Sequence, residues 1–159
     1  MKRACVVGLG LIGGSLALAF SHRQLFEEII GVDVDPRAVR SAREAGAVTA
    51  AFSSLKEGVS GADIVFVCVP VKDIPRVVRE LTPCIPPGAV ITDVGSAKRA
   101  IVEEIESSLP QGVNYLGGHP MTGSEERGFN AADPYLFENA VYVVTPTPRT
   151  TSKAREVLR

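Results

Sequence analysis

The chain has 159 residues, and 45% of them are hydrophobic, which is enough to bury one substantial core. The same length is too short for two ordinary domains, so we expect residues 1–159 to form a single one. The 17 Lys and Arg residues against 18 Asp and Glu residues give a formal net charge of −1, and the basic residues are scattered along the sequence. This balance argues against nucleic acid and against an anionic membrane surface as partners.

Targeting, membrane and metal signals are weak in this sequence. A basic start and an apolar stretch to residue 19 resemble a secretory signal, but the four glycines within residues 8–14 would weaken a signal helix. No uninterrupted run reaches the ~18 apolar residues of a membrane span. Cys5, Cys68 and Cys84 are odd in number and form no C-x-x-C pair, so they predict neither a disulfide framework nor a metal site. We expect a soluble, cytoplasmic protein whose cysteines act as small buried hydrophobes.

The first predicted elements flank a glycine-rich turn. Residues 3–7 form a short apolar run typical of a strand, and apolar residues recur at helical spacing after residue 11. Between them, Gly8, Gly10 and Gly13 form a G-x-G-x-x-G pattern. The first glycine permits a tight turn, the second lets backbone amides approach a pyrophosphate, and the third lets helix and sheet pack closely. The start of the following helix would then present free N–H groups and a positive dipole end to the phosphates.

The position of Asp33 in the sequence also indicates a dinucleotide site. Asp33 closes the apolar run 29–32 and lies 20 residues beyond Gly13. At that place a carboxylate accepts hydrogen bonds from the ribose diol of a dinucleotide. The alternative is a tight turn without a ligand and an aspartate that merely ends a strand. Strand, turn, helix, strand and acid occur in the required order, which favours a dinucleotide site.

The rest of the chain alternates between strands and helices. Pro36 and Gly46 delimit the next helix, because proline favours the first helical position and glycine the position after the end. The uninterrupted apolar run 63–69 is typical of a central parallel strand covered by helices on both faces. The remaining predicted elements are strands at 48–51, 89–94, 113–116 and 140–144 and helices at 37–45, near 55, at 74–81, 97–107 and 151–159.

This alternation predicts an α/β fold with a doubly wound, mostly parallel sheet, the NAD(P)-binding Rossmann fold. Ligands of such folds bind at the carboxyl ends of the strands. That rule selects four neighbouring places, at residues 8–13, 69–70, 95–96 and 118–119. The residues expected to contact the cofactor are Gly8, Gly10, Leu11, Ile12, Gly13, Asp33, Val69, Pro70 and Gly95.

His119 is the best acid–base candidate. It follows a predicted strand and lies between Gly118 and Pro120, which give it little steric cover. Imidazole titrates near neutral pH, with an ordinary pKa of about 6.5, so its neutral form can accept a proton there. The alternative is that the imidazole of His119 only forms hydrogen bonds within its loop and has no role in catalysis.

Ser96 lies at a neighbouring strand end. Its hydroxyl could cap the helix predicted from Ala97, and it could also fix the tautomer of His119 or bind a substrate hydroxyl. Lys98 and Arg99 oppose the dipole of that helix, which indicates either an anionic ligand nearby or solvated side chains.

The segment 121–128 follows His119 and Pro120 and carries small hydroxyl groups, two acids and three possible hinge points. Long polar loops beside strand ends commonly carry function, and an ordinary surface connection is the alternative. We expect Thr122, Ser124 and Glu125 to contact a substrate.

Three segments together resemble the prephenate/arogenate dehydrogenase family. They are residues 8–15, the run Asp93-Val94-Gly95-Ser96-Ala97-Lys98, and the run Gly117 to Glu125 followed by Leu136-Phe137-Glu138-Asn139 and Thr145-Pro146. The first motif occurs in many dehydrogenases, whereas the histidine–proline loop and the later Leu-Phe-Glu element are specific to this family. The resemblance extends over most of the chain.

The resemblance implies oxidative decarboxylation of prephenate to 4-hydroxyphenylpyruvate, in tyrosine biosynthesis, or of arogenate to tyrosine, with a nicotinamide cofactor as hydride acceptor. By the family's pattern, His119 takes the proton of the ring hydroxyl, and Ser96 contacts both this histidine and the hydroxyl. Glu125 matches a glutamate of the substrate loop. The family also has a second, helical domain that forms a homodimer, so the helix at 151–159 is expected to lead toward it. We therefore expect this chain to bind the cofactor and to turn over substrate poorly by itself.

Two other functions remain open from the sequence. One is a different Rossmann oxidoreductase, of the hydroxyacid or imine-reducing kind, which would place a catalytic lysine on a later helix. The other is a nucleotide-sensing module without chemistry. Among cofactors, Asp33 favours NAD over NADP because a carboxylate repels a 2′-phosphate, although Arg37 lies close enough in sequence to pair with that phosphate.

Overall fold

A single sheet organises the structure. In the computed structural model, which describes residues 2–158, seven strands lie in the order β3-β2-β1-β4-β5-β6-β7. All pairings are parallel except that of β6 with β7, which is antiparallel. The strands are β1 (Arg3–Val7), β2 (Glu28–Val32), β3 (Ala50–Phe52), β4 (Ile64–Val67), β5 (Val90–Asp93), β6 (Asn114–Pro120) and β7 (Tyr142–Thr145).

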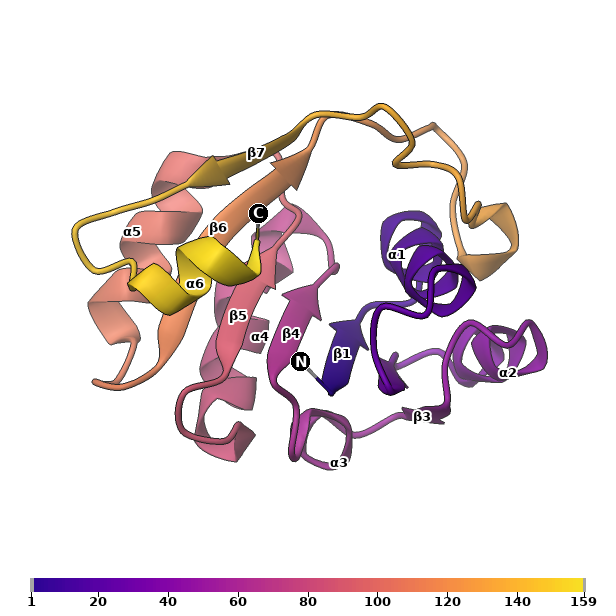
Figure 1. Cartoon of the computed structure of the whole chain (residues 1–159), viewed down its shortest axis with the longest axis horizontal. Coiled ribbons are helices and arrows are strands. Elements are labelled where there is room, and N and C mark those ends of the chain that lie inside the picture. Colours follow the sequence, from indigo (N-terminus) through magenta and orange to yellow (C-terminus); the bar gives the residue numbers. More distant parts are fainter. Residues whose placement is uncertain (1, 159) are drawn as a thin grey trace.

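The strand order confirms the predicted doubly wound α/β fold. The chain moves outward from β1 to β3, then returns to the other side of β1 and continues outward from β4 (Figure 1). The reversal lies between β1 and β4, where folds of this class bind dinucleotides. The helices are α1 (Leu11–His22), α2 (Pro36–Glu44), α3 (Leu55–Val59), α4 (Ile74–Leu81), α5 (Lys98–Ser108) and α6 (Ser152–Val157). Short 3₁₀ turns occupy Val71–Asp73, Thr82–Cys84 and Phe129–Ala131.

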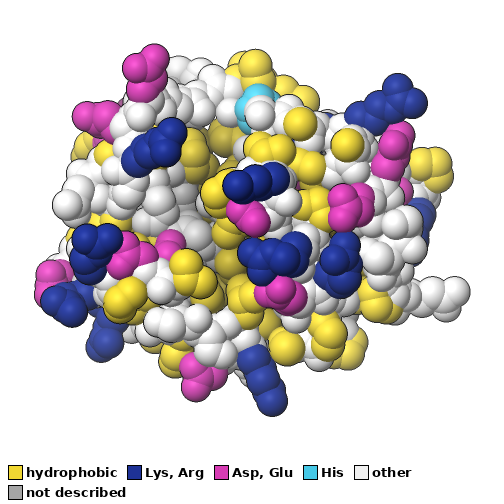
Figure 2. All heavy atoms as spheres, turned by 180° about the vertical axis from the view of Figure 1, so that it is seen from behind, with side chains coloured by type: hydrophobic (Ala, Val, Ile, Leu, Met, Phe, Trp, Pro, Cys, Tyr) yellow, Lys and Arg dark blue, Asp and Glu magenta, His cyan; other side chains and the backbone are white. Residues whose placement is uncertain are grey.

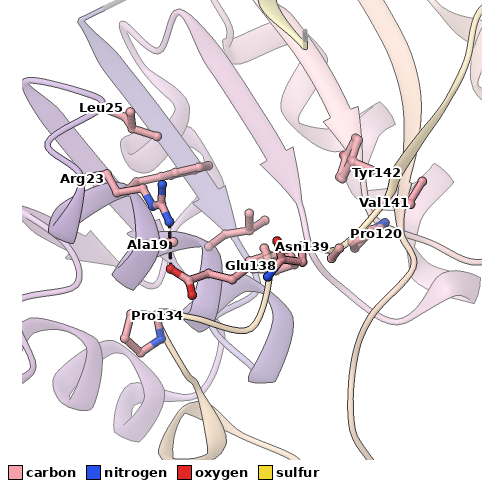
Figure 3. Close-up of a pocket in the computed structure, with 13 residues that line it drawn as sticks. Ala19, Arg23, Leu25, Pro120, Pro134, Glu138, Asn139, Val141 and Tyr142 are labelled. Atoms are coloured by element: carbon pink, nitrogen blue, oxygen red, sulfur yellow. Dashed lines mark hydrogen bonds and ion pairs between the residues drawn. The ribbon is translucent and has the colours of Figure 1, made fainter.

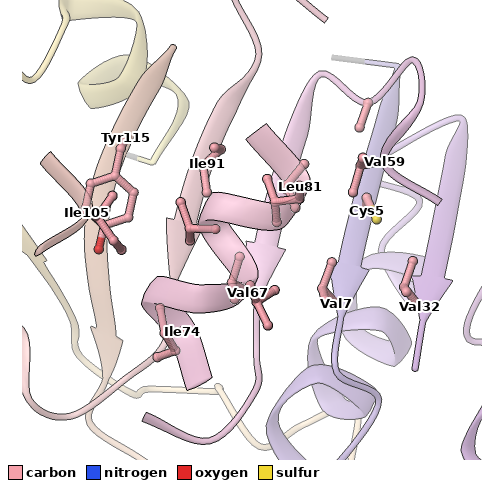
Figure 4. Close-up of a cluster of buried hydrophobic side chains, with 14 of the residues drawn as sticks. Cys5, Val7, Val32, Val59, Val67, Ile74, Leu81, Ile91, Ile105 and Tyr115 are labelled. Atoms are coloured by element: carbon pink, nitrogen blue, oxygen red, sulfur yellow. The ribbon is translucent and has the colours of Figure 1, made fainter. Parts of the chain in front are cut away.

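Helices cover both faces of the sheet, and a hydrophobic core fills each interface. On one face, α3, α4 and α5 contribute Val59, Leu81 and Ile105 to a cluster with side chains of the central strands, as Figure 4 shows with Ile105 beside Tyr115. On the other face, α1, α2 and α6 supply Leu16, Ala42 and Ala154 to the remaining clusters. Every residue of β4 and β5 is buried. This continuous burial is the reason why their sequences lack the polar alternation of one-sided sheets.

Local signals explain where several helices begin and end. Asp35 caps α2 by accepting a hydrogen bond from the backbone N–H of Arg37 at 2.9 Å, and Pro36 takes the first helical position. Gly46 follows that helix with a φ of +67°, the left-handed conformation that glycine adopts most easily. The predicted helix 74–81 coincides with α4.

Several strand boundaries differ from the prediction by one or two residues, and the end of β6 differs most. β6 was expected to end at residue 116 but continues to Pro120, since residues 117–120 pair with β7. β3 begins at Ala50 rather than residue 48, because Val48 turns into the core beside Gly31. The predicted last helix ends at Val157 in α6, and its expected end at residue 159 lies outside the described residues.

The surface carries both signs of charge in close mixture. Figure 2, the view from behind, shows Lys and Arg side chains interspersed with Asp and Glu side chains over much of that face. Pairs such as Arg79 with Glu104 (3.0 Å) and Arg76 with Glu80 (2.9 Å) account for part of this mixture. In residues 2–158, no helix is long and apolar enough to cross a membrane.

Candidate functional site

Two glycines of the turn after β1 are required by the packing of the chain itself. Gly8 has a φ of +93°, and a Cβ atom there would lie 2.6 Å from the carbonyl oxygen of Cys68. A Cβ atom on Gly13 would lie 1.8 Å from the carbonyl oxygen of Gly8. Both oxygens belong to the backbone, so neither can move aside as a flexible side chain would. These glycines allow α1 to begin directly against β1 and β4.

Gly10 is different, because nothing in the protein fills the space beside it. A Cβ atom added there would meet no heavy atom within 4 Å. Gly10 is the N-cap of α1 and has an extended conformation with no side-chain cap, and the first turn of this helix carries no acidic residue. The N–H groups of the first turn of a helix lack intrahelical partners and favour an anion. The open space beside Gly10 therefore fits a phosphate group.

Asp33 joins the glycine turn to the end of β2. One carboxylate oxygen accepts the N–H of Leu9 at 2.6 Å, and the other accepts the N–H of Asp35 at 2.8 Å. Each oxygen has two lone pairs, so the carboxylate can also accept hydrogen bonds from a diol. Arg37, the residue considered as a partner for a 2′-phosphate, is exposed and pairs with Asp35 at 3.2 Å.

Two adjoining clefts cross the carboxyl edge of the sheet. The first, of about 440 Å³, lies between Asp33 and α4 and includes Gly8 and Arg76 in its lining. The second, of about 450 Å³, lies beyond the start of α1. The residues that line both are Gly10, Cys68, Val69 and Pro70, which follow β1 and β4 at the reversal of strand order. The predicted cofactor residues Leu11, Ile12 and Gly95 line the second cleft, while Gly13 is buried beneath the turn.

The second cleft contains both residues predicted for catalysis. His119 is the penultimate residue of β6, opposite Val143 of β7, and it is partly exposed. Ser96 is exposed in the turn between β5 and α5. Both side chains line the cleft, and within residues 2–158 no hydrogen bond joins them. The N-cap of α5 is Ala97, so the serine hydroxyl does not cap this helix as one prediction had it.

The loop after His119 forms another wall of this cleft. Thr122 and Ser124, which are predicted to contact a substrate, line it together with Glu126 and Arg127. The Thr122 hydroxyl donates to the carbonyl of Leu136 at 3.1 Å, and the Ser124 hydroxyl accepts the N–H of Glu126 at 3.2 Å. Glu125 is exposed and is not part of the lining. The hydroxyls therefore shape the loop, and Glu126 and Arg127 are its charged groups in the cleft.

The sequence did not reveal a buried ion pair beneath His119 and Ser96. Asp93, at the end of β5, is fully buried and pairs with Lys98, whose side chain is only 13% exposed. Of the two alternatives for Lys98, a solvated side chain is wrong because the ammonium is paired with Asp93, and an anionic ligand nearby stays a prediction. Arg99, the next residue, is solvated as expected and pairs with Glu103 at the surface. A carboxylate that ends an apolar strand five residues before a lysine is the signal that could have indicated this pair.

A separate cavity of about 380 Å³ lies between the end of α1 and residues 134–142. Figure 3 shows Arg23 and Glu138 paired on one side of it, with Pro120 and Tyr142 on the other. Arg23 and Glu138 form an ion pair at 3.0 Å. None of the residues predicted to act in catalysis or to bind substrate or cofactor lines this cavity. In the part of the chain that the structure describes, no cluster of His, Cys, Asp and Glu is arranged to hold a metal ion.

The fold and the two clefts define a dinucleotide-binding Rossmann domain with a histidine beside the far end of its site. Comparison with known proteins identifies the family to which this domain belongs. The family model described as "Prephenate dehydrogenase, nucleotide-binding domain" matches residues 16–159. The chain belongs to this family, as its resemblance had indicated.

Individual relatives agree with this assignment. A prephenate dehydrogenase of Bacillus subtilis is 38% identical over 97% of this chain and 42% of its own length. The crystal structure of the Aquifex aeolicus prephenate dehydrogenase in complex with hydroxyphenyl propionate and NAD⁺ is similar with a TM-score of 0.90 and 27% identity, over 99% of this chain and 55% of that one. An arogenate dehydrogenase of Synechocystis gives a TM-score of 0.89 and 36% identity, over 99% and 54%. The chain thus spans about half the length of these relatives.

Proposed function

We propose that this chain binds NAD⁺ across the two joined clefts and forms the cofactor half of an enzyme that oxidatively decarboxylates prephenate. The observation that carries the proposal is the open space beside Gly10 at the start of α1, which connects the cleft of Asp33 to the cleft of His119. The pyrophosphate would take this space, and the adenosine ribose would bond to Asp33. The nicotinamide would then lie in the second cleft.

The residues of the second cleft suit the chemistry. Bound NAD⁺ would supply the hydride acceptor. His119 would accept the proton of the ring hydroxyl while hydride leaves the carbon that bears it, and the Ser96 hydroxyl would orient the same oxygen. Loss of carbon dioxide would then leave an aromatic phenolate, and the protonated His119 would return the proton to its oxygen, giving 4-hydroxyphenylpyruvate. Thr122 and Ser124 hold the loop that would border the substrate, and Glu125 stays a prediction for substrate binding.

Replacement of His119 with asparagine tests this role. In a prephenate dehydrogenase that carries this domain, we expect H119N to lower kcat by about 10²–10⁴-fold, because the general base is lost. The affinity for NAD⁺, measured by calorimetry, should change by less than about twofold, since Gly10 and Asp33 are untouched. Unchanged turnover in H119N would refute the proposed role and favour an oxidoreductase with a different base.

Cofactor choice and substrate choice need separate titrations. We expect NAD⁺ to bind this chain at least about tenfold more tightly than NADP⁺, because Asp33 repels a 2′-phosphate and Arg37 is held by Asp35. Equal affinities would contradict this preference.

Arogenate is the alternative substrate, and a comparison of kcat/KM for prephenate and arogenate decides between them. Assembly of the whole enzyme as a homodimer, and poor turnover by this chain alone, stay predictions.

A further inference from the structure

The buried carboxylate of Asp93 collects hydrogen bonds from several parts of the chain. One oxygen accepts the hydroxyl of Tyr115 at 2.7 Å and, in a longer bond of 3.4 Å, the N–H of Gly118. The other oxygen accepts the N–H of Gly95 at 2.9 Å and the ammonium of Lys98. Asp93 therefore joins the turn after β5, the start of α5 and the strand β6 at a single point.

Lys98 completes a clamp on Gly118. Its ammonium contacts Asp93 and also donates to the carbonyl oxygen of Gly118 at 2.8 Å. The N–H of Gly118 bonds to Asp93, so the ion pair holds this residue through both of its backbone polar groups. Tyr142 blocks a third side, because a Cβ atom on Gly118 would lie 2.2 Å from the tyrosine hydroxyl oxygen. The backbone of Gly118 is thus fixed from several directions.

The residues held by the pair stand next to the two candidate catalytic residues. Gly118 directly precedes His119, and Gly95 directly precedes Ser96. β6 extends beyond β5, because Asp93 lies opposite Gly117 and β6 runs on to Pro120. His119 therefore pairs with β7 on one side only, because β5 ends before it. On the side of β5, the Asp93–Lys98 pair holds the neighbouring Gly118.

Stability alone does not explain such a pair. Burial of two charges has a desolvation cost comparable to their mutual attraction, so a buried ion pair is weak support for a stabilising role. Burial lowers the pKa of the Lys98 ammonium, and the nearby carboxylate offsets part of this effect. Burial and the charge of Asp93 raise the pKa of Tyr115, which keeps its hydroxyl protonated as a donor.

We propose that the Asp93–Lys98 pair is a positioning device that fixes Gly118 and Gly95 and thereby sets the distance between the His119 imidazole and the Ser96 hydroxyl. Lys98 is then a positioning residue, acting through the backbone of β6. The inference rests on the proposed function for its catalytic consequence, whereas its structural part can be measured on this chain alone.

NMR of the chain with Lys98 replaced by methionine tests the structural part. Methionine keeps an unbranched side chain and removes the charge. We expect the backbone signals of Gly118 and the imidazole signals of His119 to shift or broaden in K98M, while those of residues 8–13 stay in place. The other histidine, His22, is exposed near the end of α1 and serves as an internal reference. The matched control is R99M, which removes the exposed charge one position further along α5 and should leave His119 unchanged.

A second variant covers the case in which K98M does not fold. Y115F retains both charges and removes only the hydroxyl that donates to Asp93. We expect it to shift the same signals of Gly118 and His119 to a smaller extent. The proposal is overturned if K98M, or Y115F where K98M is unfolded, leaves these signals within the range of R99M. It is equally overturned if the changes spread evenly to residues 8–13, since that result indicates a general loss of structure.

Turnover separates this inference from the proposed function. In an enzyme that carries this domain, K98M should lower kcat by about 10–100-fold with little change in the KM for NAD⁺, because misplacement of a reacting group by ~1 Å can cost about 10²-fold. K98R, which retains the charge, should recover part of the loss. If H119N abolishes turnover and K98M does not lower kcat, the positioning role is wrong and the proposed function stands. If H119N has no effect, the proposed function itself is wrong.

Discussion

The turn after β1 and the turn after β5 connect a parallel strand to a helix at the same edge of the sheet, but they are built in opposite ways. The first depends on glycines. Gly8 and Gly13 allow close contact between backbone segments, and Gly10 leaves the space beside it open. The second is made by buried charge, since Asp93 and Lys98 tie the turn to β6. The first arrangement makes room for a ligand, and the second fixes the groups that would act on it.

The largest effect is expected from breaking the buried pair. D93N leaves the Lys98 charge without its carboxylate, which we expect to lower the free energy of unfolding by about 3 kcal/mol or more. Urea unfolding followed by circular dichroism measures this loss. E103Q, which breaks the exposed pair with Arg99 on the same helix, should stay within about 0.5 kcal/mol of the parent. Equal losses of unfolding free energy in D93N and E103Q would show that burial of the Asp93–Lys98 pair does not increase its effect on stability.

The next effect concerns the glycine that the fold itself needs. G13A places a Cβ atom 1.8 Å from the carbonyl oxygen of Gly8, so α1 must move away from β1. We expect a loss of about 3 kcal/mol in the free energy of unfolding, at the upper end of the cost of overpacking. A thermal melt of G13A that matches the parent would mean that the turn adapts, contrary to the packing described for it.

Gly10 should separate stability from binding. G10A adds a methyl group to open space, so its free energy of unfolding should fall by only about 0.5 kcal/mol. The affinity for NAD⁺ should fall by about tenfold or more, because the methyl group occupies the place of the pyrophosphate. Calorimetric titration measures this affinity. NAD⁺ binding by G10A that equals the parent would place the pyrophosphate elsewhere.

The smallest effect lies at the opposite edge of the sheet and depends on pH. Backbone N–H groups of Arg3 and Lys2 lower the pKa of Asp63. A carboxylate with a lowered folded-state pKa stabilises the protein above its ordinary value near 3.9, and this stabilisation is lost as the pH falls through the lowered value. D63N should therefore be less stable than the parent by about 0.5 kcal/mol at pH 7, with a smaller difference near pH 3. A difference that grows on acidification would contradict this assignment, and NAD⁺ binding should be unaffected throughout.

The same contrast explains what could be predicted from the sequence. The glycine turn, Asp33 and the strand–helix alternation depend on spacing along the chain, and the structure confirms the fold that they predict. His119 and Ser96 were predicted from the rule that ligands bind at strand ends, and the structure brings both to one cleft. Their roles in catalysis stay predictions.

Features that depend on contacts across the fold were missed. The continuation of β6 to Pro120 follows from pairing with β7, which lies more than 20 residues later. The side chain of Lys98 points to Asp93 and to Gly118, a contact that helix spacing alone does not indicate. Glu125 was chosen within its loop by resemblance, whereas the cleft is lined by Glu126 and Arg127, because the fold of the loop decides which neighbours face inward.

A crystal structure of this chain with NAD⁺ tests the central claim most directly. The account predicts the adenosine ribose at Asp33, the pyrophosphate beside Gly10 and the nicotinamide ring next to His119 and Ser96. A dinucleotide bound in the cavity of Arg23 and Glu138, or a nicotinamide ring directed away from His119, would contradict it.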